Sequence, residues 1–379
     1  MGVNKKGGLV GGFDQLRAPD APTISVATAG TGELAVTITN PSNTGGGDIT
    51  GYAVSALTGP IEDTTFAVTV VSSGGNKYAI DGSFPTRGLF MGGSNGAGSY
   101  YNTIQYIDIS TTGNTTDFGD LTESKEVWDG VAGNATRSIS FGGNANGATN
   151  VIEYVNPTSA GNGTDFGDMP VNDTNVALAA LANNTRAVYQ RKEGVTVEYV
   201  TIASTGNPSD FGDATVYRRL GAAGFASTTR GCIAGGMPAS GSTLVNVIDY
   251  ITIGSTGNST DFGDLTVARY GPTGCSNATR GLILGGETGS GFSDVIDYVT
   301  IASTGNATDF GDLLAGVQSG TACASTTRAV KGGGSISGGT QDVMQYVTIA
   351  STGDATDFGD LAANTYRLGA TSVGHGGLS

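Results

Sequence analysis

The sequence predicts an all-β protein: a six-bladed β-propeller closed by its C-terminal strand and preceded by a small β-sandwich-like N-terminal module. Two observations lead to this prediction. The tetrapeptide Asp-Phe-Gly-Asp recurs at regular intervals, and glycine makes up 64 of the 379 residues, about 17% against a usual ~7%. A period near fifty residues indicates supersecondary units that bury their apolar faces only against one another. Abundant glycine disfavours long helices and suits short strands and turns.

Three recurring positions define the repeat. The Asp-Phe-Gly-Asp copies begin at Asp117, Asp165, Asp210, Asp261, Asp309 and Asp357. A tyrosine precedes each copy by eleven residues: Tyr106, Tyr154, Tyr199, Tyr250, Tyr298 and Tyr346. A Thr-Arg pair opens each unit, with its arginine at Arg87, Arg137, Arg186, Arg230, Arg280 and Arg328. Six such units in a row can close into a ring with a shared interior.

The fifth unit shows the expected strands most clearly. After Arg280 an apolar run ends in Gly285-Gly286, and a polar loop over 287–294 follows. A second strand is expected over 295–302, a tight turn over 303–306, and a third strand at 308–310. We expect Gly305 and Asn306 to tolerate positive φ in that turn, and the Gly311-Asp312 pair to bend the chain. A fourth strand of small residues then completes the four antiparallel strands of one blade.

The third unit and the chain end make two further predictions. Residues 189–193 replace the Gly-Gly pair of the third unit, so we expect a shortened loop there, either as a lateral contact site or as a tolerated change. The last strand of the inter-unit type lies at 366–373. Pairing of this strand with 87–92 would leave the ring without a free sheet edge.

The first 83 residues differ from the repeats. Residues 1–19 are expected to form a flexible arm, because they are rich in glycine. Alternation of apolar and polar residues predicts strands at 34–38 and 49–56, and 66–72 and 77–80 supply further candidates. Residues 20–59 resemble the first half of a fibronectin type III module, so the domains are expected to be 1–19, 20–83 and 84–379.

Charge and cysteine content limit the possible partners. The net charge of −15 argues against nucleic-acid binding through phosphate contacts. There is no apolar stretch long enough to insert into a membrane and no visible signal peptide, so synthesis in a cytoplasm is expected. Cys275 and Cys323 occupy matching places 48 residues apart, as small buried repeat residues do.

Candidate chemistry is sparse. The Asp309 and Asp312 carboxylates are expected to accept backbone N–H groups of their turn, with calcium binding as the alternative. Asn-X-Thr sequences at Asn114, Asn162, Asn258 and Asn306 are interpreted as turn chemistry. His375 is the only histidine and is expected to lie exposed in the tail. The repeated arginines and tyrosines are expected to serve packing and hydrogen bonding in every blade. We therefore expect no enzyme activity, no cofactor and no resident metal.

Large side chains in variable segments are the candidate binding residues. Tyr100, Tyr101 and Phe292 stand in otherwise polar loops, and Trp128 replaces a small or polar residue between two units. Aromatic residues there suit sugar stacking or protein contacts. Covering a blade face is the alternative role.

The repeat resembles the Kelch repeat: an apolar strand ends in Gly-Gly, a tyrosine follows on the next strand, and an aromatic residue lies near the following turn. Its Thr-Ile-Ala-Ser-Thr-Gly-Asn-Ala-Thr-Asp-Phe-Gly-Asp-Leu core is similar to Kelch-like repeats of structural and fibre proteins in tailed phages, especially marine ones. The resemblance implies a virion structural protein, oligomeric in the particle. Its partners would be other virion proteins and a host-surface glycan. A free carbohydrate- or protein-binding Kelch module is the alternative.

Overall fold

The computed structural model describes residues 86–378 except 145–146, 171–176 and 239–242, together with the backbone of four strands nearer the N-terminus. The chain separates into two compact units, Met1–Phe84 and Pro85–Ser379. In the first unit, β1 (Thr23–Ala29) pairs with β2 (Leu34–Thr39), and β3 (Ala67–Val71) pairs with β4 (Lys77–Asp81), both antiparallel. The predicted arm over 1–19 and the predicted strand over 49–56 lie outside the described residues.

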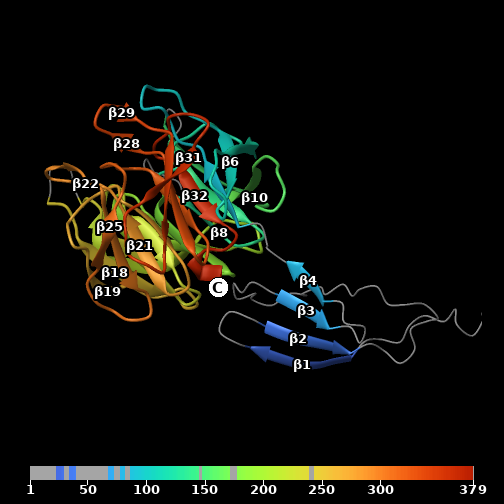
Figure 1. Cartoon of the computed structure of the whole chain (residues 1–379). Coiled ribbons are helices and arrows are strands. Elements are labelled where there is room, and N and C mark those ends of the chain that lie inside the picture. The colour runs from blue at the N-terminus through green and yellow to red at the C-terminus, as the bar shows by residue number, and fades with distance from the viewer. Residues whose placement is uncertain are drawn as a thin grey trace, which may run out of the picture. The chain divides into compact units, whose positions relative to one another are not determined.

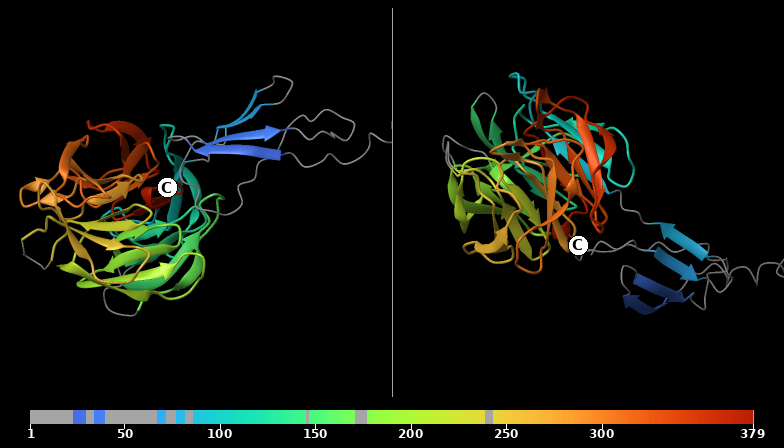
Figure 2. Two further views of the ribbon diagram at one scale, coloured as in Figure 1. Left: turned by 90° about the horizontal axis from the view of Figure 1, so that it is seen from below. Right: turned by 60° about the vertical axis from the view of Figure 1, so that its left-hand side comes forward.

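The second unit is a six-bladed propeller in which each blade is a four-stranded antiparallel sheet (Figures 1 and 2). From the inner strand outward, blade 1 is β32 (Gly369–Ser372), β5 (Arg87–Met91), β6 (Thr103–Asp108) and β7 (Thr116–Asp120). Blade 2 is β8 (Val131–Gly133), β9 (Ser138–Asn144), β10 (Ala148–Val155) and β11 (Thr164–Asp168). Blade 3 is β12 (Ala177–Ala182), β13 (Arg186–Arg191), β14 (Gly194–Thr201) and β15 (Ser209–Arg218).

Blades 4 to 6 repeat the pattern. Blade 4 is β16 (Ala223–Ala226), β17 (Arg230–Ala234), β18 (Val247–Thr252) and β19 (Thr260–Asp264). Blade 5 is β20 (Thr273–Ser276), β21 (Arg280–Leu284), β24 (Val295–Thr300) and β25 (Thr308–Asp312). Blade 6 is β26 (Thr321–Ala324), β27 (Arg328–Gly332), β30 (Val343–Thr348) and β31 (Thr356–Asp360). Short hairpins β22 (Glu287–Thr288) with β23 (Gly291–Phe292) and β28 (Ser335–Ile336) with β29 (Gly339–Thr340) extend the last two blades.

The predicted ring closure is confirmed. The last strand, β32, pairs with β5 in the register Gly369 opposite Met91 and Ser372 opposite Gly88. Each inner strand likewise comes from the segment that follows the preceding Asp-Phe-Gly-Asp copy, so every blade is completed by the neighbouring sequence repeat. The inner strands contact one another in a full circle around the axis. A sheet joined this way has no free edge at the seam.

The apolar core is divided into six clusters, each of which lies between two adjacent blades. The cluster between blades 5 and 6, for example, joins Cys275, Leu282 and Phe310 to Val347 and Ile349. All three cysteines are buried and free. The burial of Cys275 and Cys323 agrees with the prediction from their repeat positions. Because each apolar face packs on a neighbour and not on itself, the blades depend on one another for burial.

An arginine, a tyrosine and a phenylalanine form the same stack in each blade. In blade 5 the Arg280 guanidinium carbon lies 4.4 Å from the Tyr298 ring centroid, and that ring meets Phe310 edge-on with the centroids 5.9 Å apart. Arg280 Nη1 also donates to the carbonyl oxygen of Ile349 in blade 6 at 2.6 Å. Equivalent bonds join Arg87 to Pro157, Arg137 to Ile202, Arg186 to Ile253, Arg230 to Ile301 and Arg328 to Ile109. The predicted packing and hydrogen-bonding role of these residues is confirmed.

The Asp-Phe-Gly-Asp strand forms a second set of hydrogen bonds to the next blade. Gly353 N donates to Phe310 O at 2.8 Å, and Asp312 N donates to Asp354 Oδ1 at 3.1 Å. Elsewhere an asparagine takes the place of Asp354: Asn114, Asn162, Asn207, Asn258 and Asn306 accept from Asp360, Asp120, Asp168, Asp213 and Asp264. A Cβ on Gly311 would lie 2.5 Å from Gly353 O, so a close backbone approach explains the glycine.

Three local expectations are wrong. Gly311 and Asp312 do not bend the chain but belong to β25, in which Phe310 is the extra residue of a bulge between Ile296 and Asp297 of the partner strand. The Asp309 and Asp312 carboxylates are exposed and accept no hydrogen bond from the described residues. The backbone N–H of Asp312 instead donates to Asp354 Oδ1. Asn306 keeps negative φ, and its side chain reaches the preceding blade.

Blade 3 has the shortened loop that its sequence predicts. Only Lys192 and Glu193 connect β13 to β14, with Glu193 at φ 57°. The outer strand β15 is extended to ten residues, so that Arg218 pairs opposite Gly194.

A buried polar side chain on the third strand of each blade receives a hydrogen bond or ion pair from its surroundings. Buried ion pairs join Lys125 to Glu153 at 2.7 Å, Arg218 to Asp249 at 2.7 Å and Arg269 to Asp297 at 3.0 Å. In blades 6 and 1 the acid is replaced by Gln345 and Gln105, and the position of the base is held by Val317 and Thr365. Acid and base therefore appear together or are absent together in these units, as the cost of burying an unpaired charge requires.

Candidate binding site at the axial mouth

The segments that lead into the inner strands form a hydrogen-bonded chain around the propeller axis. Gly271 N donates to Gly221 O at 3.0 Å, Ser319 N to Gly271 O at 2.8 Å, Arg367 N to Ser319 O at 2.7 Å and Trp128 N to Arg367 O at 3.0 Å. All five residues have positive φ. We call this end of the axis the axial mouth. Its side chains are those of Glu126, Trp128, Lys192, Tyr270, Tyr366 and Arg367.

Left-handed backbone conformations in non-glycine residues gather at the mouth. In the described residues they are Trp128, Asp129, Ala179, Glu193, Ser319 and Arg367. Ala180 N donates to Asp129 O, and Glu193 follows Lys192, whose side chain lies near Trp128. Such conformations cost about 1–3 kcal/mol each and cluster at functional sites.

The segment that carries Trp128, like the one that carries Gly221, is one residue longer than the segment that carries Gly271. Trp128 follows Leu121 by seven positions, whereas Gly271 follows Leu265 by six. Val127 N and Trp128 N consequently both donate to Arg367 O, and two successive residues, Trp128 and Asp129, adopt positive φ.

Glu126 organises the centre of the mouth. Its Oε2 accepts from Trp128 Nε1 at 3.2 Å and from Arg367 Nη1 at 3.1 Å, and its Oε1 accepts from Ser94 Oγ at 2.8 Å. The Arg367 guanidinium carbon lies 3.8 Å from the Trp128 ring centroid and 4.7 Å from that of Tyr366. Stacking on two rings and a charge-assisted hydrogen bond hold Arg367 in a single position.

Lys192 and two tyrosines complete the site. Lys192 Nζ lies 5.7 Å from the Trp128 ring centroid, and burial lowers the pKa of Lys192. Tyr270 donates to Glu287 Oε2 at 2.7 Å; burial and this bond raise the pKa of Tyr270 to about 12. Trp128, Tyr366, Tyr270 and Lys192 are all half-buried. The site thus offers stacking surfaces and hydrogen-bonding groups.

Two ionisable groups lie beneath the mouth. Burial raises the pKa of Asp129 to about 7, although a hydrogen bond from Thr321 acts in the opposite direction. Burial also lowers the pKa of Lys331 to about 7, while the charge of Asp129 partly offsets that shift. Lys331 Nζ donates to Gly333 O at 2.7 Å.

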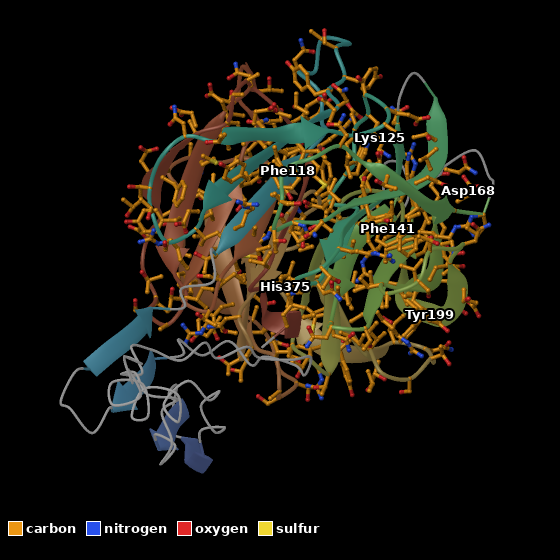
Figure 3. The ribbon with its side chains drawn as sticks, turned by 90° about the vertical axis from the view of Figure 1, so that its right-hand side faces the viewer. Phe118, Lys125, Phe141, Asp168, Tyr199 and His375 are labelled. Carbon is orange, nitrogen blue, oxygen red and sulfur yellow. The ribbon has the colours of Figure 1, made fainter. Side chains whose placement is uncertain are left out.

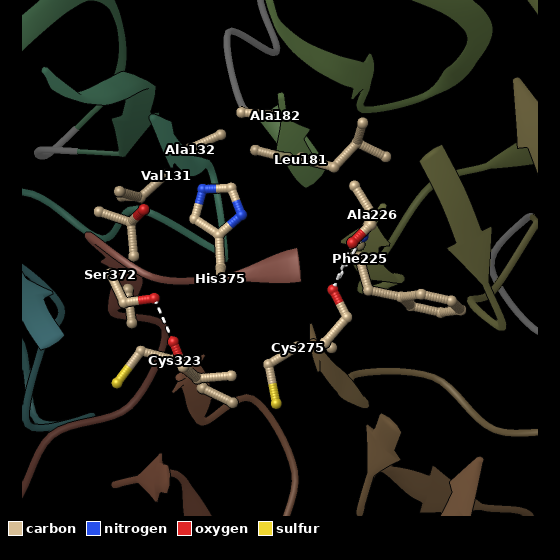
Figure 4. A pocket seen from close by; sticks show the side chains of 18 residues that line it. Val131, Ala132, Leu181, Ala182, Phe225, Ala226, Cys275, Cys323, Ser372 and His375 are labelled. Carbon is tan, nitrogen blue, oxygen red and sulfur yellow. Dashed lines mark hydrogen bonds between the residues drawn. The ribbon is translucent and has the colours of Figure 1, made fainter. Parts of the chain in front are cut away.

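The other end of the axis is filled by the C-terminal segment. Figure 3 labels Lys125, just before the mouth segment, well apart from His375. His375 Nε2 lies 2.7 Å from Gly133 O, and the 3-10 helix η1 (Gly376–Leu378) packs beside the inner strands. A cavity of about 50 Å³ is lined by these strands, Cys275, Cys323 and His375 (Figure 4). The expectation of an exposed tail histidine is wrong because η1 anchors the segment against the ends of the inner strands.

The structure brings together only part of the predicted binding set. Trp128 lies in the mouth, whereas Tyr100 and Tyr101 lie in the loop after β5 and Phe292 lies on β23. Among the described side chains, none of those three rings stacks on Trp128.

Sequence reasoning missed Glu126, Lys192, Tyr270, Tyr366 and Arg367. Alignment of the inter-blade segments contains the signal, since Trp128 and Arg367 occupy the place of Gly221, Gly271 and Ser319.

Comparison of the chain with models of known protein families and with curated proteins found no match to either. Within the described part of the chain, no group of three or more His, Cys, Asp or Glu residues is placed to hold a metal ion. No helix among the described residues is long and apolar enough to cross a membrane. Fold and site geometry therefore provide the basis for the functional argument.

Proposed function

We propose that this chain is a virion structural protein of a tailed phage. In this proposal, the propeller is displayed for assembly contacts or attachment to a host surface, and the protein acts by binding and not by catalysis. The protein would be made in the host cytoplasm and assembled as an oligomer with other virion proteins. The similarity of its repeats to Kelch-like repeats of phage structural and fibre proteins supports this setting.

The observation that carries the proposal is the division of labour between repeated and non-repeated residues. The repeated arginine and glycine positions make blade-to-blade contacts, and the repeated tyrosine and phenylalanine pack in the apolar clusters between blades. By contrast, Trp128, Arg367 and Lys192 are not repeated at the equivalent positions of the other units. These three residues meet at one end of the axis. A rigid closed ring that presents one distinctive surface suits recognition.

Mass spectrometry of purified particles tests the proposal. The chain should be present at a fixed number of copies per particle and should remain after high-salt washing. A labelled antibody to the propeller should then locate it on intact particles by electron microscopy. Particles that form and infect without the chain would refute a structural role.

The second candidate is a free carbohydrate- or protein-binding module of Kelch type. The gathering of half-buried aromatic and charged side chains at the mouth favours it, because a scaffold alone does not need them. Saturable ligand binding by the chain together with its absence from particles would favour this candidate.

A further inference from the structure

Cations at the axial mouth differ from the other cations of the propeller. Fourteen arginines and lysines lie within residues 86–378. Six of them stack on the blade tyrosines, and Lys125, Arg218, Arg269 and Lys331 are buried. The other four are Arg191, Lys192, Arg219 and Arg367. In a chain of net charge −15, the cations of the described propeller residues that neither join blades nor fill the core thus gather on one side of the propeller.

Lys192 is the member of this group that has no carboxylate within ion-pair distance, although the charges of Glu193 and Glu126 act on it from further away. Arg367 pairs with Glu126 at 3.1 Å, Arg219 with Glu193 at 3.3 Å and Arg191 with Glu198 at 3.7 Å. In the described residues no carboxylate oxygen lies within 4.0 Å of Lys192 Nζ. Its ammonium group instead lies over the Trp128 ring at 5.7 Å. A cation that makes no close ion pair and lies beside an aromatic ring can bind a ligand that carries both an apolar face and a negative charge.

We propose that the axial mouth binds a carboxylate-bearing sugar, of the uronic or sialic acid class, at the end of a glycan. The apolar face of the sugar ring would pack on the part of the Trp128 ring that Arg367 does not cover, and the sugar carboxylate would pair with Lys192. This inference deepens the proposed function, on which it rests for the idea that the propeller is a recognition module. Arg367 and Glu126 position the tryptophan ring and do not need to touch the ligand.

The shape of the mouth favours a terminal sugar over an acidic peptide. Extended peptides bind by adding a strand to a free sheet edge or by filling a long groove. The inner strands here are paired in every blade, and the mouth offers a compact set of half-buried side chains. A single sugar ring matches one tryptophan face and one ammonium group.

The chain carries its own reporter, because Trp128 is the only tryptophan. We would titrate the full chain with methyl glucuronide and with a methyl sialoside, using methyl glucoside as the uncharged control, and follow tryptophan fluorescence. A saturable change with at least one acidic sugar is expected, with affinity at least about tenfold weaker for methyl glucoside. Raising the salt concentration should weaken binding of the acidic sugar.

Two variants with the same charge change separate contact from general electrostatics. Lys192→Gln should weaken binding of the acidic sugar by about tenfold or more. Arg191→Gln changes the adjacent residue, which pairs with Glu198, and should leave the affinity within about threefold. Circular dichroism of both variants checks that the fold is retained.

Several results would overturn the inference: no saturable response to any acidic sugar, equal affinity for methyl glucoside, equal loss in both variants, or saturation by an acidic peptide instead. These outcomes are independent of the particle analysis. Acidic-sugar binding without the chain in virions would refute the virion role alone, whereas the chain in virions without sugar binding would refute this inference alone.

Discussion

Replacing the buried ion pair of blade 5 by the uncharged pair of blade 6 tests how the repeats handle buried charge. Asp297 accepts from Thr266 N at 3.1 Å, from Thr266 Oγ1 at 2.7 Å and from Arg269 Nη2 at 3.0 Å, and both members of the ion pair are fully buried. At the equivalent place in blade 6, Gln345 Oε1 accepts from Leu314 N at 2.8 Å beside Val317. The change is therefore Arg269→Val together with Asp297→Gln.

The structure sets the expected magnitudes. Arg269→Val alone leaves the Asp297 carboxylate buried without its cation, which should reduce the free energy of unfolding by about 3–5 kcal/mol. The double variant retains an acceptor for Thr266 N and removes both charges, so it should lie within about 1 kcal/mol of the wild type. The coupling energy between the two sites should then be at least about 2 kcal/mol.

Urea unfolding followed by far-UV circular dichroism measures these differences, with Asp297→Gln alone completing the cycle. The reasoning would be refuted if the double variant were as unstable as Arg269→Val. That outcome would mean that the arginine stabilises the blade by filling space and not by neutralising the acid.

Three further predictions concern a glycine, a lysine and the histidine. Gly311→Ala should destabilise the ring by at least about 1 kcal/mol more than Gly305→Ala. A Cβ at position 311 would meet Gly353 O, whereas a Cβ at position 305 would meet open space. Equal urea midpoints of the two variants would contradict this prediction. The pKa of the buried Lys331 amine is lowered from 10.5 to about 7, so unfolding takes up a proton between those pH values. The free energy of unfolding of the wild type, relative to that of Lys331→Met, should therefore increase as pH rises from about 7 to 10.5. A difference that does not change with pH would refute this prediction. Burial lowers the pKa of His375, so an NMR titration of this only histidine should give a value below 6.5, and a value at or above 6.5 would contradict the buried placement.

The repeats made the ring predictable from sequence. Tyrosine and phenylalanine at fixed spacing mark the third and fourth strands of every blade, counted from the axis, and the last inter-unit strand pairs with β5. The local backbone geometry of the strands was harder to predict from the sequence. The bulge at Phe310 leaves no separate mark in the sequence.

The mouth was harder to predict because its residues come from distant segments. Trp128 was identifiable as an unusual residue. Arg367 contacts Glu126, 241 positions away, only because the ring closes, and Lys192 comes from the loop of another blade. Repeat reasoning also emphasises what the units share, whereas the mouth is made of what they do not share. The same logic concealed His375, whose segment lies beyond the last repeat yet packs against Gly133.

The chain of left-handed residues around the mouth links stability to recognition. Gly221 and Gly271 adopt this conformation without a Cβ, whereas Ser319 and Arg367 adopt it at φ 52° and 54°. Ser319→Gly should therefore raise the free energy of unfolding by about 0.5–1 kcal/mol, because relief of the left-handed strain exceeds the entropic cost of glycine. Arg367→Gly gains the same relief but loses the Trp128 stack and the Glu126 bond, so it should not be stabilised and should change the tryptophan fluorescence. Equal stabilisation of both variants in urea would show that Arg367 contributes nothing to the mouth, and that its strained backbone has no role in holding Trp128.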